Sequence, residues 1–353
     1  MKKYILLLLN ILLVSINANA QVAGTGYYLP KTEMRFQLLI EKTSYTPGEY
    51  AVFSERFLKR KAKEKNYTEY NIVGLKMYTT SIPDSAKSYT VPMDKKHIIF
   101  NVELDRSGIL LAINTKPKQM PEHDFFTPYP KTKMPNPHDF MSEEILTAGS
   151  TAKMAELTAR EIYDIRTSRS ELTRGEAEYM PKDGDQLKIM LANLDRQESI
   201  LLQTFLGVTQ KDTIEQEIVY CPAGSANEDD APAEKEVLFR FSKKFGLVDA
   251  NDLAGAPYYL EIEDLKVIPE LQTAVDGKKR SKNDIGVMVN MPGKIKATVF
   301  EGNRPMTSFE LYAAQYGRLE SLSSELFSKK MLSKLQLNPI TGYVETLETE
   351  PLD

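Results

Sequence analysis

The pattern most suggestive of catalysis is Ser150-Thr151-Ala152-Lys153. A serine at the start of a helix can become a nucleophile when a lysine one turn later activates it, an arrangement written S-x-x-K. Ser281-Lys282-Asn283 could supply the accompanying S-x-N element, but no K-T-G or K-S-G triplet occurs. Ser150 also precedes an apolar helical stripe, where serine is a common N-cap. Ser150 and Lys153 are therefore catalytic candidates, with a helix cap as the alternative.

Two histidine-aspartate pairs suggest metal chemistry. The pairs lie in a short internal repeat, Glu122-His123-Asp124-Phe125 and Pro137-His138-Asp139-Phe140. If the loop folded back on itself, the four polar side chains could ligate a divalent metal ion. The metal candidates are His123, Asp124, His138 and Asp139. The spacing matches no compact metal motif, so the alternative is that these side chains make hydrogen bonds within the loop.

Both pairs belong to a proline-rich loop, residues 116–141. Its prolines exclude a helix and a central strand, so we expect an extended surface segment. The prolines are Pro117, Pro121, Pro128, Pro130, Pro135 and Pro137. Exposed aromatic side chains on such a loop suit binding to a protein or a sugar. The binding candidates are Phe125, Phe126 and Tyr129, whose alternative role is to anchor the loop.

A helical hairpin, residues 142–207, follows the loop. Apolar residues recur at helical spacing in two segments, with charged residues on the opposite faces. The first stripe is Met154, Leu157, Ile162 and Ile165, and the second is Leu187, Met190, Leu191, Leu194, Leu201 and Phe205. Met180-Pro181-Lys182-Asp183-Gly184 provides the turn between them, and Gly207 is placed as a helix stop. The hairpin must pack on the strands that flank it.

Both flanks of the hairpin are rich in strands. In residues 21–115, Met34, Phe36, Leu38 and Ile40 alternate with polar residues, which is typical of a half-buried strand. Residues 208–353 form a second β-rich region of many short strands, with turns at Pro292-Gly293, Gly302-Asn303 and Asn338–Gly342. The sequence predicts an α+β protein with two β-rich, sandwich-like halves and an inserted α-helical hairpin.

The N-terminal residues 1–20 predict a secretory signal peptide. Lys2 and Lys3 begin it, an apolar run follows, and Ala18-Asn19-Ala20 is a suitable cleavage site. We therefore expect export through the Sec pathway, to the periplasm or the cell surface, and no transmembrane segment in the mature chain. The formal charge of the whole chain is −4, and it becomes −6 without Lys2 and Lys3, so no nucleic acid partner is expected.

Several blocks resemble a family of uncharacterised exported proteins from Bacteroidetes, catalogued as a domain of unknown function. The resemblance extends from Gly26 to about Tyr343, and it implies export while supplying no catalytic or binding residue. The blocks are Tyr28–Thr32, Tyr45–Tyr50, Glu144–Ala155, Ala314–Gly317 and Asn338–Gly342.

Two classes of function follow from these observations. The first is a non-enzymatic cell-envelope protein that binds or scaffolds another envelope protein or a glycan, and it needs no cofactor. Export, abundant tyrosine and the scarcity of catalytic motifs favour it. The alternative is a hydrolase that acts on glycan or peptide. A hydrolase predicts a cleft lined by at least two carboxylates, or a Ser150 hydroxyl that is hydrogen-bonded to Lys153.

Overall fold

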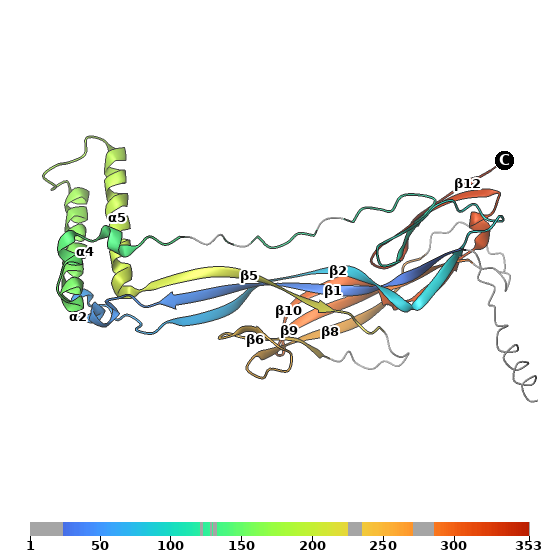
Figure 1. The fold of residues 1–353 in the computed structure, drawn as a ribbon, viewed down its shortest axis with the longest axis horizontal. Coiled ribbons are helices and arrows are strands. Elements are labelled where there is room, and N and C mark those ends of the chain that lie inside the picture. Colours follow the sequence, from blue (N-terminus) through green and yellow to red (C-terminus); the bar gives the residue numbers. More distant parts are fainter. Residues whose placement is uncertain are drawn as a thin grey trace, which may run out of the picture.

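A three-stranded antiparallel sheet forms the long axis of the molecule (Figure 1). The computed structural model describes residues 24–120, 123–127, 129, 133–224, 235–270 and 286–352. The sheet has the order β2-β1-β5, with β1 at Gly24–Thr46, β2 at Tyr67–Pro92 and β5 at Val208–Tyr220. At roughly 3.3 Å per residue, β1 alone extends for about 75 Å.

One face of this sheet packs on a second antiparallel sheet of order β10-β9-β8-β6-β7. Its strands are β6 (Glu236–Ser242), β7 (Gly246–Val248), β8 (Ala256–Val267), β9 (Val287–Glu301) and β10 (Arg304–Leu322). The alternating side chains Met34, Phe36, Leu38 and Ile40 of β1 are all buried in this contact. We call the packed face of the long sheet its inner face and the opposite one its outer face.

A third sheet, of order β12-β11-β4-β3, lies at one end of the molecule. It consists of β3 (Val102–Leu104), β4 (Leu110–Ile113), β11 (Met331–Leu337) and β12 (Val344–Pro351). A short 3-10 helix, η3 (Ser324–Phe327), packs in the same core. Because β4 pairs with β11, strands more than 200 positions apart in the sequence form one sheet.

The helices gather at the other end of the long sheet, where α4 and α5 lie side by side with their axes across the strands (Figure 1). The elements are η1 (Ala51–Phe53), α2 (Ser54–Leu58), η2 (Pro137–Phe140), α3 (Glu143–Leu146), α4 (Thr151–Arg174) and α5 (Gly184–Leu206). They share a core around Tyr50, Ile162, Leu201 and Phe205. The predicted hairpin therefore forms one helical module with the segment that follows β1. The expectation that it packs on the flanking strands is wrong, because its apolar faces are covered by these other helical segments.

A buried polar cluster joins the three sheets, and we call it the sheet junction. The Thr32 N–H donates to Gln315 Oε1 at 3.0 Å, and Gln315 Nε2 donates to the Thr32 carbonyl at 2.7 Å. Asn290 Nδ2 donates to the carbonyls of Pro30 (3.1 Å) and Thr341 (2.9 Å). Such pairing stabilises buried polar groups, and Asn290 Oδ1 is the atom of the cluster without a hydrogen-bond partner among the described residues. Three blocks that carry the family resemblance, 28–32, 314–317 and 338–342, meet at this cluster.

The predicted α+β, strand-rich class is confirmed, with several antiparallel sheets and few helices. The two β-rich regions of the sequence share sheets and cores, because β1 and β2 are long enough to enter both. Within the described residues, no helix is long and apolar enough to cross a membrane. The predicted signal peptide and Ser281-Lys282-Asn283 lie outside the described residues.

Candidate functional site

Ser150 has the geometry of a helix cap. Its Oγ accepts a hydrogen bond from the backbone N–H of Lys153 at 3.2 Å, with extended backbone angles at the start of α4. The Lys153 ammonium donates instead to Glu156 Oε1 at 3.0 Å, and this hydrogen bond lowers the pKa of the Glu156 carboxyl. The lysine is engaged with a carboxylate, so the geometry favours the cap over a serine nucleophile.

The two histidine-aspartate pairs contact different parts of the molecule. The His123 ring stacks on Tyr78 of β2 with centroids 4.2 Å apart, whereas His138 Nε2 lies 3.0 Å from Glu49 Oε2 near the helical module. The loop between them runs extended along the long sheet (Figure 1) and does not bring the pairs together. Among the described residues, no three His, Cys, Asp or Glu side chains are grouped to hold a metal ion.

The proline-rich loop follows the outer face of the long sheet. Asp124 pairs with Lys76 of β2 at 2.8 Å, and Asp139 Oδ1 accepts a weak hydrogen bond from Asn136 at 3.4 Å. Further along, the backbone N–H of Tyr129 donates to Thr213 Oγ1 of β5 at 2.9 Å. The loop thus contacts both edge strands of the sheet and is held there by side-chain contacts.

The three aromatic candidates differ in exposure. Phe126 is half-buried on Gly74, where an added Cβ would lie 2.8 Å from its ring, and the Lys76 ammonium lies 4.6 Å from the ring centroid. Phe125 is 54% exposed and touches Tyr78 only edge-on, and Tyr129 is 72% exposed. Phe126 therefore anchors the loop, while Phe125 and Tyr129 are available to a partner.

Replacing Phe126 with alanine is expected to release the loop. Loss of the ring removes its packing on Gly74 and its contact with Lys76. Trypsin cleavage within residues 116–136 should become about tenfold faster, since cleavage of a locally opened segment follows the free energy of opening. Phe125→Ala is the matched control and should change the rate little. Equal rates for the two variants would contradict the assignment of Phe126 as the anchor.

A hollow of about 450 Å³ opens where the loop, β2 and the turn between β11 and β12 meet, and we call it the loop groove. It is lined by Tyr78, Thr79, Lys118, Gln119, Met120, His123, Asn338, Pro339, Ile340 and Glu345. The turn is rigid because Asn338 Oδ1 accepts hydrogen bonds from the N–H groups of Ile340 and Thr341, both at 2.9 Å. A fixed turn and an anchored loop thus form the two walls.

Among the described lining residues of the loop groove, Glu345 is the carboxylate, and it is paired. Its Oε1 accepts from Asn338 Nδ2 at 2.8 Å. Its Oε2 lies 2.8 Å from Lys118 Nζ, an ion pair whose angles are not those of a hydrogen bond. The remaining lining groups are aromatic, apolar or neutral polar, apart from Lys118 and His123. The described part of the lining thus offers apolar and polar contacts to a ligand or partner.

A charged network supports Tyr78 from the outer face of the sheet. Arg35 donates to Glu33 and to Glu217, both at 2.8 Å, and the Tyr78 hydroxyl donates to Glu217. Burial and this hydrogen bond raise the pKa of Tyr78 above its ordinary value. The hydrogen bond from Tyr78, followed by Arg35, lowers the pKa of the Glu217 carboxyl. Tyr78 is therefore held in place as a neutral hydrogen-bond donor beneath His123.

Replacing Glu217 with glutamine should reduce the acid sensitivity of folding. Because the pKa of Glu217 is lowered in the folded protein, its contribution is complete above the ordinary carboxyl value of 4.5 and is lost as the pH falls below it. Since the group is partly exposed, the expected loss for Glu217→Gln at pH 7 is at most about 1 kcal/mol. The difference between wild type and variant should shrink by pH 3 in urea denaturation.

Glu215→Gln is the control for this pH experiment. Glu215 is exposed on the same strand and the same face, opposite Leu39. Its variant should follow the wild-type pH profile throughout. If Glu215→Gln and Glu217→Gln behaved alike, the network around Arg35 would contribute nothing specific.

A second hollow, on α5, contains two carboxylates, Asp195 and Glu198. Arg169 bonds both, at 2.6 and 2.7 Å, and Arg166 donates to Glu198 at 2.6 Å. Both carboxylates thus accept hydrogen bonds from arginine side chains of α4. This hollow is therefore bordered by an ion-pair network that joins α4 to α5.

Sequence reasoning identified His123 but missed the residues that complete the loop groove. Tyr78 is one of 18 tyrosines and lies in an ordinary strand pattern. Lys118 and Glu345 are separated by more than 200 positions and meet only through the pairing of β4 with β11. The Asn338–Gly342 block was recognised as a turn, which was the one available signal for this wall.

Comparison with protein families gives one match. The model of a family described as a domain of unknown function (DUF4831) matches residues 23–345. The match includes every described helix, the long sheet and all residues of the loop groove. Comparison with curated proteins and with solved structures gives no match.

Proposed function

The chain belongs to the family described as a domain of unknown function (DUF4831), and from the geometry of the loop groove we propose that it is an exported, non-enzymatic envelope protein that binds another envelope protein. Residues 1–20, with their basic start, apolar run and Ala18-Asn19-Ala20 site, support export. The periplasm or the cell surface is the compartment that this route allows.

The loop groove is the observation that carries the binding proposal. Its walls present Met120, Pro339 and Ile340, and the exposed ring of Phe125 lies near it on Tyr78. Methionine and aromatic residues are enriched at the centres of protein interfaces, with polar residues around them. Lys118 and Gln119 supply such a polar border. A partner that inserts an apolar side chain would meet a prearranged surface, which lowers the entropic cost of binding.

The paired state of the charged groups supports binding over hydrolysis. Glu345 is engaged by Lys118 and Asn338, and Ser150 caps α4. Neither arrangement provides an activated nucleophile or a proton donor. The elongated sheet also suits a scaffold, because it separates the loop groove from the helical module along one rigid element (Figure 1).

Replacing Met120 with aspartate tests the proposal. Met120 is 40% exposed, so the change should leave the fold intact while placing a charge in the groove. A photo-crosslinker at position 125 in living cells first identifies the partner by peptide mapping. Met120→Asp should then weaken binding of the purified partner by about tenfold or more, since an unpaired charge must be desolvated.

Met180→Asp is the matched control, because Met180 is 43% exposed on the helical module. It should bind the partner as the wild type does. A partner that crosslinks at position 125 but binds both variants equally would show that the loop groove is not the interface. Capture of a glycan rather than a protein at this position would also overturn the proposal.

A further inference from the structure

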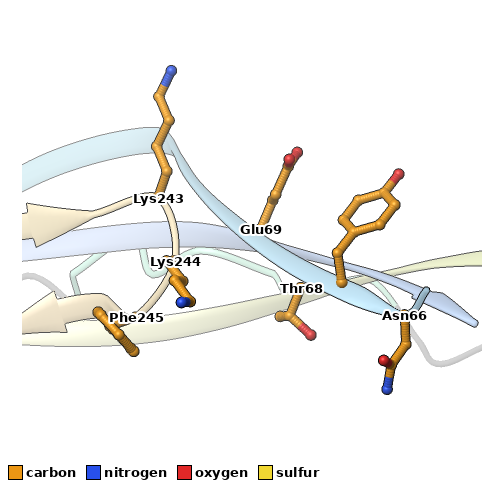
Figure 2. A pocket seen from close by; sticks show the side chains of 7 residues that line it. Asn66, Thr68, Glu69, Lys243, Lys244 and Phe245 are labelled. Carbon is orange, nitrogen blue, oxygen red and sulfur yellow. The ribbon is translucent and has the colours of Figure 1, made fainter.

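A third hollow, of about 540 Å³, lies some ten residues from Tyr78 along β2, a separation of about 33 Å. We call it the basic hollow. It is lined by Asn66, Tyr67, Thr68, Glu69, Lys243, Lys244 and Phe245. Asn66 precedes β2, the next three residues begin that strand, and the last three form the tight turn between β6 and β7 (Figure 2).

The turn is fixed against the long sheet. The backbone N–H of Tyr70 in β2 donates to the Lys243 carbonyl at 2.8 Å. This bond places the turn on the edge of β2, and Figure 2 shows Lys244, Phe245 and Thr68 directed to one side of the strand and Lys243 and Glu69 to the other. The side chains of the turn are therefore held in a defined arrangement around the strand edge.

The basic hollow is positively charged in a chain whose formal net charge is −4. Within the described part of the chain, Lys243 and Lys244 lie in no ion pair with a carboxylate. The basic run Lys59–Lys65 leads directly into Asn66, and Lys63 donates to the Tyr67 hydroxyl at 3.1 Å. Glu69 is the single carboxylate of the lining. An excess of cations at one place attracts anionic ligands.

The hollow also presents an aromatic surface. Phe245 is 59% exposed, and the Lys244 ammonium lies 5.4 Å from its ring centroid. Tyr67 stacks on Tyr45 with centroids 5.1 Å apart, which fixes the start of β2. Exposed rings of this kind pack on the apolar faces of sugar rings. Asn66 and Thr68 add amide and hydroxyl groups that can bond sugar hydroxyls.

We propose that the basic hollow binds an acidic glycan, with Phe245 packing on a sugar ring and Lys244, on the same side of the strand, contacting a carboxylate or sulfate group, while Lys243 adds positive charge from the other side of the strand edge. A simple polyanion would need only the lysines, whereas the exposed ring and the amide of Asn66 match the other groups of a saccharide. This site is independent of the loop groove, since the two share no lining residue. The protein would then hold a glycan and a protein partner on one sheet.

The absence of tryptophan from the sequence allows a direct binding assay. Phe245→Trp places a single indole in the hollow while keeping an aromatic ring. Titration with polygalacturonate, a uronic acid polymer, should give a saturable change in tryptophan emission, and neutral dextran should give none. The affinity should fall as the salt concentration rises, because part of the attraction is electrostatic.

Paired variants separate a specific site from general charge attraction. In the Phe245→Trp background, Lys243→Gln with Lys244→Gln should weaken polygalacturonate binding by about tenfold. The control is Lys329→Gln with Lys330→Gln, which removes two positive charges from another exposed lysine pair. This control should weaken polygalacturonate binding less than twofold. Phe245→Ala, measured by calorimetry, should weaken binding by about fivefold with an unchanged salt dependence.

Three results would overturn the proposal. Equal losses for the two lysine pairs would indicate unspecific charge attraction. If Phe245→Ala bound polygalacturonate with unchanged affinity, Phe245 would not contact a sugar ring. Equal or tighter binding of a thymidine oligonucleotide, or of phosphatidylglycerol vesicles, would identify a different class of anion. Because Met120 lies outside this hollow, the partner-binding experiment can fail or succeed separately.

Discussion

Replacing Gly207 with alanine is expected to lower the free energy of unfolding by about 3 kcal/mol. Gly207 has φ +76° and ψ −176°, a combination that is essentially restricted to glycine. An added Cβ would also lie 2.4 Å from the Thr46 carbonyl oxygen. The residue ends α5 and leads directly into β5, so the backbone cannot relax there without moving the helical module. Urea denaturation followed by circular dichroism measures the change.

Two other glycines provide controls for this prediction. Gly184 begins α5 and has nothing within 4 Å of an added Cβ, so Gly184→Ala should be neutral or stabilise by up to about 1 kcal/mol. Gly302 has φ +58° with the same open space, so Gly302→Ala should cost about 1 kcal/mol from backbone strain alone. A Gly207→Ala protein as stable as Gly184→Ala would refute the strained connection.

Asn290→Ala should also cost about 3 kcal/mol, because it leaves two buried carbonyls without donors. Asn290 is fully buried in the sheet junction, where its Nδ2 bonds the carbonyls of Pro30 and Thr341. Asn290→Asp should be worse at pH 7, since a carboxylate can only accept hydrogen bonds and would face the same carbonyls. Thermal unfolding of the purified variants tests both expectations.

Asn71→Ala is the control for the junction. Asn71 lies on β2 and is exposed, so its replacement should change stability by less than about 0.5 kcal/mol. The junction also positions the Asn338–Gly342 turn, through the Thr341 carbonyl. Asn290→Ala is therefore expected to weaken partner binding at the loop groove as well. Similar unfolding temperatures for Asn71→Ala and Asn290→Ala would show that the junction bonds contribute little.

The helices were predictable from sequence because their signals are local. The stripe on α4 includes the buried Ile162, and Gly207 ends α5 as expected. On α5 the C-terminal part is buried, at Leu201 and Phe205, whereas Met190 of the predicted stripe is 40% exposed. The long strands were harder, because Pro30 and Pro83 interrupt the strand pattern. In the structure these two prolines face one another beside an irregularity in the β1–β2 register, so neither strand ends there.

The site depended on pairings that no local pattern reveals. The prolines predict a loop without helix, whereas Pro137–Phe140 form the 3-10 helix η2, because a proline is tolerated in the first turn of a helix. The alternative role of Phe126 as an anchor is in line with its contact with Gly74. The position of His123 over Tyr78 depends on the path of the loop across the sheet, however, and the wall at Asn338 depends on β11. Residues so distant in sequence meet only after the sheets have formed, so composition and spacing could not place them together.

The length of β1 and β2 has a mechanical consequence for the proposed binding of two partners. A load applied between the helical module and the opposite end would act along these strands, at right angles to the hydrogen bonds between them. The bonds would then share the force in shear, whereas a load across the sheet would break them one after another. The hydrogen-bonded pairing of β1 with β2, which extends through both strand-rich cores, thus makes the molecule most resistant to a load along its long axis.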